Sequence, residues 1–211
     1  LTFKASTGKG VYSFCMCPGG YVVNASSEEK RLCINGMSYS KRDSGIANSA
    51  IIVTVNEMDY GTNLFDGVKF QRALEEKAYF LGNGMIPIER YGDFKNKRFP
   101  KNLGSLEPKI KGRYSLADLN ELLPEVLNKS LKEAIEYFGK KISGFNNDCS
   151  LLCGVEARTS SPIRILRDEN YEANIGGIYP SGEGAGYAGG ITSAAIDGLK
   201  VSEAIMNKYK A

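Results

Sequence analysis

A glycine-rich segment near the end of the sequence constrains the fold more than any other feature. Five of the nine residues from 182 to 190 are glycine, which is costly to order unless the backbone needs positive φ or another group approaches it closely. A strand-like stretch, Gly177 to Ser181, precedes this segment, and apolar residues at helical spacing predict a helix over 192–206. The order strand, glycine loop, helix is typical of a nucleotide or flavin cradle, and also of a tight turn with small residues for close packing.

This segment holds candidate binding groups. A helix N-terminus presents bare N–H groups that attract anions and electron-rich oxygens. The carboxylate of Glu183 can accept hydrogen bonds from sugar or polyol hydroxyls. The spacing of Gly182, Gly184, Gly186 and Gly189 only overlaps the dinucleotide pattern G-x-G-x-x-G, so the glycines alone do not decide between a cradle and a turn.

The preceding chain has the pattern of an α+β protein. Alternating or β-branched runs predict strands over 11–17, 21–23, 31–34 and 51–55, and strand character returns over 151–166. Helical spacing predicts a helix that begins near Asp66 and ends at the glycines around Asn83, and a second helix from about Glu125 to Gly139.

Composition excludes several classes of function. The chain has no histidine, which removes Ser-His-Asp triads, Cys-His pairs and histidine zinc sites. Its apolar runs are too short for a membrane-spanning helix. The formal net charge of +3 gives no argument for nucleic acid. We therefore expect no membrane and no nucleic-acid partner.

A basic stretch from Asp93 to Arg113 carries seven lysines and arginines against two acids. Its prolines and glycines predict a loop, and a solvated surface connection is the favoured interpretation. A phosphate- or RNA-binding loop is the weaker alternative, because no aromatic platform is evident beside it.

The five cysteines are odd in number and unevenly spaced, which fits a reducing compartment, and we expect a cytoplasmic protein with no metal site. In a regular strand, Cys15 and Cys17 would share one face about 7 Å apart, too far for a disulfide without distortion. They are either small packing residues or candidate catalytic thiols that face a substrate.

Three blocks of sequence carry a family resemblance. They are VYSFCMCPGG at 11–20, GVEARTSSPIR at 154–164 and GIYPSGEGAGYAGGI at 177–191. Together they resemble a bacterial family of FAD-dependent proteins, the NAD(FAD)-utilising dehydrogenases. Members of that family are longer, and their N-terminal βαβ unit carries the G-x-G-x-x-G site that is absent here. The chain also begins with Leu1 rather than Met, so we expect a C-terminal part of a longer polypeptide.

The resemblance implies a division of the chain into two parts. Residues 1–173 would form a mixed-sheet, substrate-type α+β domain of a two-domain FAD-dependent oxidoreductase. Residues 174–211 would be the last strand, glycine loop and helix of the FAD-binding domain, with the N-terminal half as partner. The implied flavin-binding residues are Gly182, Glu183, Gly184, Gly189, Gly190 and Ile191.

The same resemblance suggests the chemistry. Arg158 becomes a candidate for pairing with an anionic substrate or reduced flavin, or else an arginine at a strand edge. The full-length protein would transfer a hydride between FAD and an unknown small molecule, with NAD(P)H as a conceivable donor, and this part alone would be inactive. The alternative function is a non-catalytic module that binds a substrate or partner without a cofactor.

Overall fold

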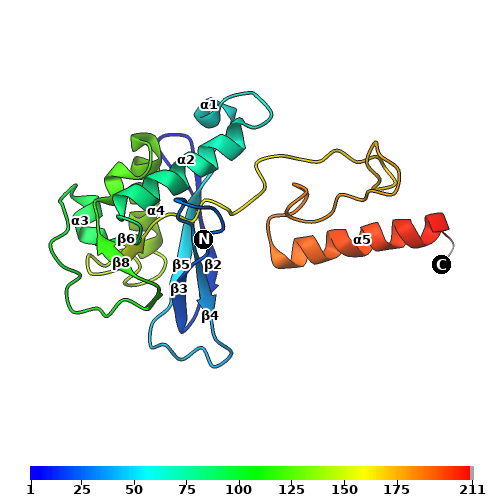
Figure 1. The fold of residues 1–211 in the computed structure, drawn as a ribbon. Helices are drawn as coiled ribbons and strands as arrows, with labels where there is room; N and C mark the ends of the chain where they lie inside the picture. Colours follow the sequence, from blue (N-terminus) through cyan, green and yellow to red (C-terminus); the bar gives the residue numbers. More distant parts are fainter. Residues whose placement is uncertain (210–211) are drawn as a thin grey trace. The chain divides into compact units, whose positions relative to one another are not determined.

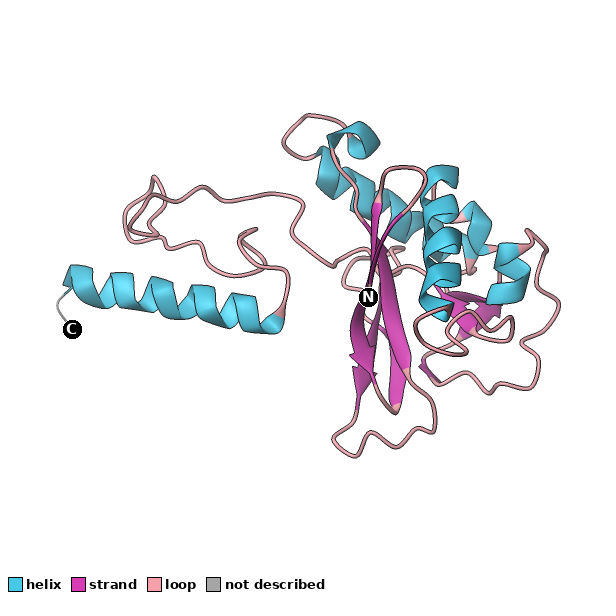
Figure 2. Cartoon of the chain, turned by 180° about the vertical axis from the view of Figure 1, so that it is seen from behind, coloured by secondary structure: helices cyan, strands magenta, loops and turns pink. Residues whose placement is uncertain are grey.

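The computed structural model describes residues 1–209 and confirms the α+β fold. The chain divides into two compact units, which we describe separately. The first unit comprises residues 1–59 and 70–157, and the second comprises residues 60–69 and the chain from Arg158 onward. Every strand of the described residues belongs to the first unit, whereas the long helix α5 (Ile191–Tyr209) belongs to the second (Figures 1 and 2).

Three small sheets build the first unit. The first sheet pairs β1 (Thr2–Lys4), β2 (Gly10–Cys17) and β5 (Asn48–Val53), all antiparallel. The second sheet places β3 (Gly20–Asn24) between antiparallel β4 (Ile34–Ser38) and parallel β7 (Ile110–Lys111). The third sheet places β6 (Ile86–Arg90) between parallel β8 (Tyr114–Leu116) and antiparallel β9 (Leu151–Cys153).

Short and long helices complete the chain. They are α1 (Glu57–Tyr60), α2 (Asp66–Leu81), α3 (Tyr91–Lys95), the 3-10 helix η1 (Leu119–Glu121) and α4 (Glu125–Gly139). The main core of the first unit joins side chains from α2, β6, α3 and α4, with Tyr91 and Ile86 fully buried. A smaller cluster packs Phe138 of α4 against Val11 of β2.

Helical periodicity predicted α2 and α4 correctly. Helix α4 occupies Glu125–Gly139 as expected. Helix α2 ends where the glycines stop it, because Asn83 and Gly84 adopt positive φ and the N–H of Gly84 donates to the carbonyl of Tyr79. These boundaries follow from local chemistry, which a single sequence contains.

A β-bulge corrects the expectation for the two neighbouring cysteines. Phe14 is opposite Ala50, but Cys17 is opposite Asn48, so two residues of β2 face one residue of β5. Cys15, with φ 45°, lies in this bulge. Because the extra residue reverses the alternation, Cys17 joins the face of Phe14, and Cys15 does not share that face. The prediction that both sulfurs lie on one face is wrong.

Three strand predictions also need correction. Of the stretch 31–34, only Ile34 lies in a strand. Leu32 and Cys33 are buried, but the N–H of Leu32 donates to the carbonyl of Glu75 on α2 and not to a neighbouring strand. Strand β9 ends at Cys153, so the pattern over 151–166 overestimates its length. Residues 177–181 form no strand, because no other strand within the described chain pairs with them.

A buried carboxyl lies at the centre of the third sheet. Glu89 of β6 is fully buried, and its Oε1 accepts a hydrogen bond of 2.7 Å from the N–H of Leu119 at the start of η1. Its Oε2 has no hydrogen-bond partner among residues 1–209. Burial raises the pKa of Glu89 from 4.5 to about 8, and the nearby carboxylates of Asp118 and Asp93 act in the same direction. Glu89 is therefore protonated at neutral pH.

We predict that Glu89 makes the first unit less stable as the pH rises. Between the unfolded pKa of 4.5 and the folded pKa of about 8, the folded state holds a proton that the unfolded state has lost. The free energy of unfolding should therefore fall with a slope approaching about 1.4 kcal/mol per pH unit. Glu89→Gln, which resembles the protonated acid, should lack this slope. Denaturant unfolding at several pH values measures both proteins, and parallel curves would contradict the prediction.

Candidate functional site

The glycines before α5 have two distinct structural roles. Gly182 and Gly186 adopt positive φ of 71° and 85°, and a Cβ on Gly186 would lie 2.6 Å from the carbonyl oxygen of Ile163. These two glycines are required by the turn itself. In contrast, a Cβ on Gly184 or Gly189 would meet no atom within 4 Å, and neither residue has positive φ. Nothing within the second unit therefore requires glycine at positions 184 and 189.

Asp197 of α5 anchors the glycine loop. Its Oδ2 accepts from the N–H of Gly182 at 2.9 Å and from Arg167 Nη1 at 2.9 Å, while its Oδ1 accepts from Arg167 Nη2 at 2.6 Å. Arg167 also donates to the carbonyl oxygen of Pro180 at 2.7 Å. The guanidinium lowers the pKa of Asp197 to about 2, so the pair persists through the neutral and mildly acidic range.

Aromatic stacking and backbone bonds close the loop on the segment before it. Arg167 lies 3.6 Å from the centroid of the Tyr187 ring, whose hydroxyl donates to the carbonyl of Ile165. Ala185 is buried, and its carbonyl accepts from the N–H of Ile165. The N–H of Tyr187 donates to the carbonyl of Gly182, so some of the loop's backbone hydrogen bonds form within the loop itself. The loop is therefore a preformed structure within the second unit.

Four of the six residues expected to bind a cofactor are exposed on this loop, whereas the N–H groups of Gly182 and Gly190 are already bonded within the second unit. The Glu183 side chain is exposed and has no partner among residues 1–209, whereas its carbonyl accepts from the N–H of Gly186. The N–H of Gly190 donates to Ser193 Oγ at 3.2 Å. The N–H groups of Gly189 and of Ile191, the first residue of α5, have no acceptor within the described chain. Those two amides can receive an electron-rich edge of a ligand.

The candidate catalytic residues are divided between the two units. Cys15 is exposed and Cys17 half-buried on β2 of the first unit, where the thiol of Cys17 donates to the carbonyl of Cys15 at 3.5 Å. Arg158 is exposed at the start of the long segment of the second unit. Burial raises the pKa of the Cys153 thiol to about 12, so this cysteine is protonated and unsuited to nucleophilic chemistry.

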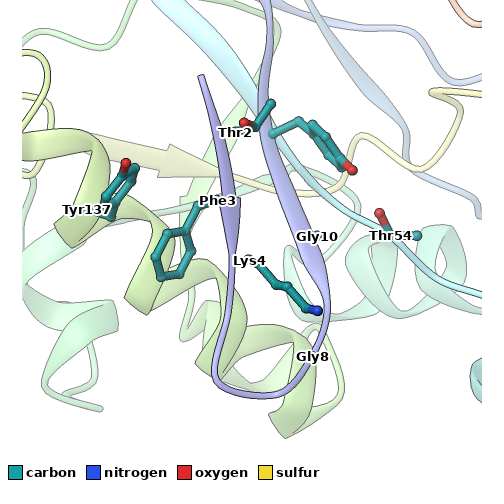
Figure 3. A pocket seen from close by; sticks show the side chains of 8 residues that line it. Thr2, Phe3, Lys4, Gly8, Gly10, Thr54 and Tyr137 are labelled. Carbon is teal, nitrogen blue, oxygen red and sulfur yellow. The ribbon is translucent and has the colours of Figure 1, made fainter.

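An open hollow lies elsewhere, in the first unit. Figure 3 shows Phe3 and Tyr137 in its wall, and Lys4 and Thr54 beside it. The rings of Phe3 and Tyr137 are stacked with centroids 4.8 Å apart. None of the candidate catalytic or cofactor-binding residues lines it. Within residues 1–209, no three acidic or cysteine side chains gather closely enough to hold a metal ion. Nor does this part of the chain contain a helix with the length and apolar character to span a membrane.

Sequence reasoning missed Arg167 and Asp197, which hold the site together. They are 30 residues apart, and no local motif connects them. One signal was available: Asp197 falls at helical spacing on the stripe of α5 that contains Ala194 and Val201. A carboxylate on a packing face needs a partner, which predicts a cation nearby in space.

Comparisons with known proteins identify relatives of this chain. Residues 1–159 match the model of a family described as FAD-dependent protein, C-terminal domain-like. An uncharacterised protein of Clostridium beijerinckii is 48% identical over 214 residues, an alignment that covers 99% of this chain. The chain spans only 40% of the length of that relative.

We predict that Asp197→Ala loosens the glycine loop. The substitution removes the acceptor of the Gly182 N–H and leaves Arg167 without its anion, which should cost about 2 kcal/mol of local stability. Hydrogen exchange at the amides of Gly182 and Tyr187 would measure this loss. Glu203→Ala is the matched control, because it places the same residue at an exposed position of α5. Equal exchange rates in both variants would contradict the anchoring role.

Proposed function

The chain belongs to the FAD-dependent protein C-terminal domain-like family, and from this membership we propose that it works as the C-terminal part of a flavin-dependent oxidoreductase. The family match over residues 1–159 is the observation that carries the proposal. The relative that extends well beyond the matched region is consistent with further sequence that would complete a flavin site. Bound FAD would supply the capacity to accept and donate a hydride.

The glycine loop fits one edge of a flavin. The free side of Gly184 and Gly189 allows a flat ring to approach the backbone, since a Cβ there would meet no atom of the second unit within 4 Å. The N–H groups of Gly189 and Ile191 can donate to ring oxygens and nitrogens, and oriented donors stabilise negative charge. Gly182, anchored by Asp197, and Gly190 fix the loop, and Glu183 is available to ribityl hydroxyls.

The domain assignment follows from this role. Residues 1–173 would cover the flavin and its substrate, and residues 174–211 would return to the FAD-binding domain. Helix α5 supports the assignment of residues 174–211 to the FAD-binding domain, because its apolar side chains Ile191, Leu199 and Met206 are exposed. Such a row of apolar side chains on a helix requires a covering surface.

The same proposal extends to the hydride donor and to the residues that contact the substrate. The resemblance to NAD(FAD)-utilising dehydrogenases favours hydride transfer between the flavin and a small molecule, with NAD(P)H as donor. Arg158 would pair with an anionic group of the substrate. Cys15 or Cys17 would act singly at the substrate, because the bulge in β2 separates the two thiols onto different faces.

We predict that Gly189→Ala in the full-length polypeptide weakens FAD binding without destabilising the protein. A methyl group would stand where the ring approaches, so the Kd for FAD should rise about tenfold, equivalent to about 1.4 kcal/mol. The melting temperature of the cofactor-free protein should not change, because the new Cβ meets no neighbouring atom. Flavin absorbance and fluorescence titration measure the binding.

Gly198→Ala is the matched control for this experiment. Gly198 lies on α5, and a Cβ there also meets nothing within 4 Å, so the control should leave FAD affinity near its original value. Its melting temperature should rise slightly, because alanine favours a helix interior more than glycine does. A full-length protein that purifies without flavin and takes up none when FAD is added would overturn the proposal. That result would instead favour the module without a cofactor.

A further inference from the structure

One face of the second sheet carries aromatic side chains outside both hydrophobic clusters of the first unit: Tyr39 is exposed and Tyr21 is half-buried. The register places Tyr21 of β3 opposite Met37 of β4, and Val23 opposite Lys111 of β7, all on the same side. The other side of the sheet turns Val22, Ile34 and Ile110 into the main core. Tyr39, directly after β4, extends the outward side. We call Tyr21, Met37, Tyr39 and Lys111 the tyrosine face.

The tyrosine face has the chemistry of a protein interface. The side chains of Met37 and Tyr39 are 57% and 61% exposed. The rings of Tyr21 and Tyr39 pack edge to face with centroids 5.6 Å apart, and the ammonium of Lys111 lies 4.4 Å from the first and 5.6 Å from the second. Adjacent tyrosine and methionine side chains are enriched at the buried centres of interfaces, and contiguous exposed patches of this kind mark interaction sites.

We propose that the tyrosine face docks onto the part of the polypeptide that lies outside residues 1–211. The proposal rests on the proposed function, in which this chain is one part of a larger flavoprotein. The clostridial relative supplies the size argument: this chain covers 40% of it, so the remainder is long enough to form a covering domain. The docking surface should be apolar, with a carboxylate opposite Lys111. The two tyrosine rings help to hold that ammonium in place as water is excluded.

Charge argues against a nucleic acid as the occupant. Within the basic stretch, Lys95, Lys97, Arg98 and Lys109 all pair with carboxylates, and the partner of Lys109 is Glu107. The ammonium of Lys111 already lies over the ring face of Tyr21 on which a base would stack. Four of the seven basic residues in this stretch are therefore neutralised, whereas a surface that binds a polyanion needs unpaired cations.

Methionine oxidation of the full-length protein tests the proposal. Met37 and Met16 have nearly equal exposed fractions, 57% and 54%, and Met58 is 90% exposed. If the tyrosine face is docked, peroxide should oxidise Met37 about tenfold more slowly than Met16 and Met58, a protection worth about 1.4 kcal/mol. A carbodiimide should also link Lys111 to an acidic residue outside residues 1–211, which mass spectrometry identifies.

A matched pair of variants separates docking from other causes of protection. Tyr39→Glu places a charge in the tyrosine face and should raise the oxidation rate of Met37 to that of Met16. Tyr114→Glu changes a tyrosine that is 42% exposed on the third sheet, and should leave Met37 protected. Tyr39 and Tyr114 are both on the surface of the first unit, so neither change should unfold it.

Several results would overturn the proposal. Met37 oxidised as fast as Met16 in the full-length protein would show an uncovered face. Protection that disappears on dilution would identify a second copy, and protection that requires added single-stranded RNA would identify a nucleic acid. A Lys111 cross-link within residues 1–211 would assign the cover to this chain. Flavin absorbance of the same samples distinguishes a failure of the docking proposal from a failure of the proposed function. A protein that binds flavin but has a reactive Met37 would contradict the docking proposal alone.

Discussion

The carboxylate of Asp197 organises the second unit, because it joins three segments that are distant in sequence. It holds the N–H of Gly182 at the entry to the glycine loop, belongs to α5 at the exit, and pairs with Arg167 from the preceding segment. The guanidinium in turn stacks on Tyr187. A glycine-rich loop has a large conformational entropy to lose, and a nearly buried two-point ion pair offsets part of it before any ligand binds. The pair fixes the entry to the glycine loop at Pro180 and Gly182.

The glycines separate into those that the fold requires and those that it does not. Positive φ at Gly182 and Gly186 would exclude most other residues whether or not the loop binds anything. Gly184 and Gly189 have no such requirement, and the space beside them is open. An interpretation as a mere tight turn accounts for the first pair only. The second pair has no structural role within the second unit, and the proposed flavin-binding loop would give it one.

Local patterns predicted the elements whose cause is local. The apolar spacing of α2, α4 and α5, and the glycine stop after Leu81, follow from neighbouring residues. The bulge in β2 was not predictable, because Cys15 at positive φ has none of the glycine signature of such a position. The expected strand over 177–181 failed because a strand needs a partner, which a short apolar run cannot supply. The pairing of Arg167 with Asp197 spans 30 residues, and local sequence patterns could not predict it because the partner is distant in the chain.

Two boundaries found in different ways fall at nearly the same place. The family match ends at residue 159, and the first compact unit ends at Ala157. Similarity to the clostridial relative nevertheless continues over 99% of the chain. The glycine loop and α5 are thus shared with a longer protein but lie beyond the matched domain. This segment has open glycines, unpaired amides and exposed apolar side chains on α5, which the proposed function would explain by a neighbouring flavin domain. The tyrosine face also exposes apolar side chains, and in the proposed flavoprotein a neighbouring part of the polypeptide would cover them.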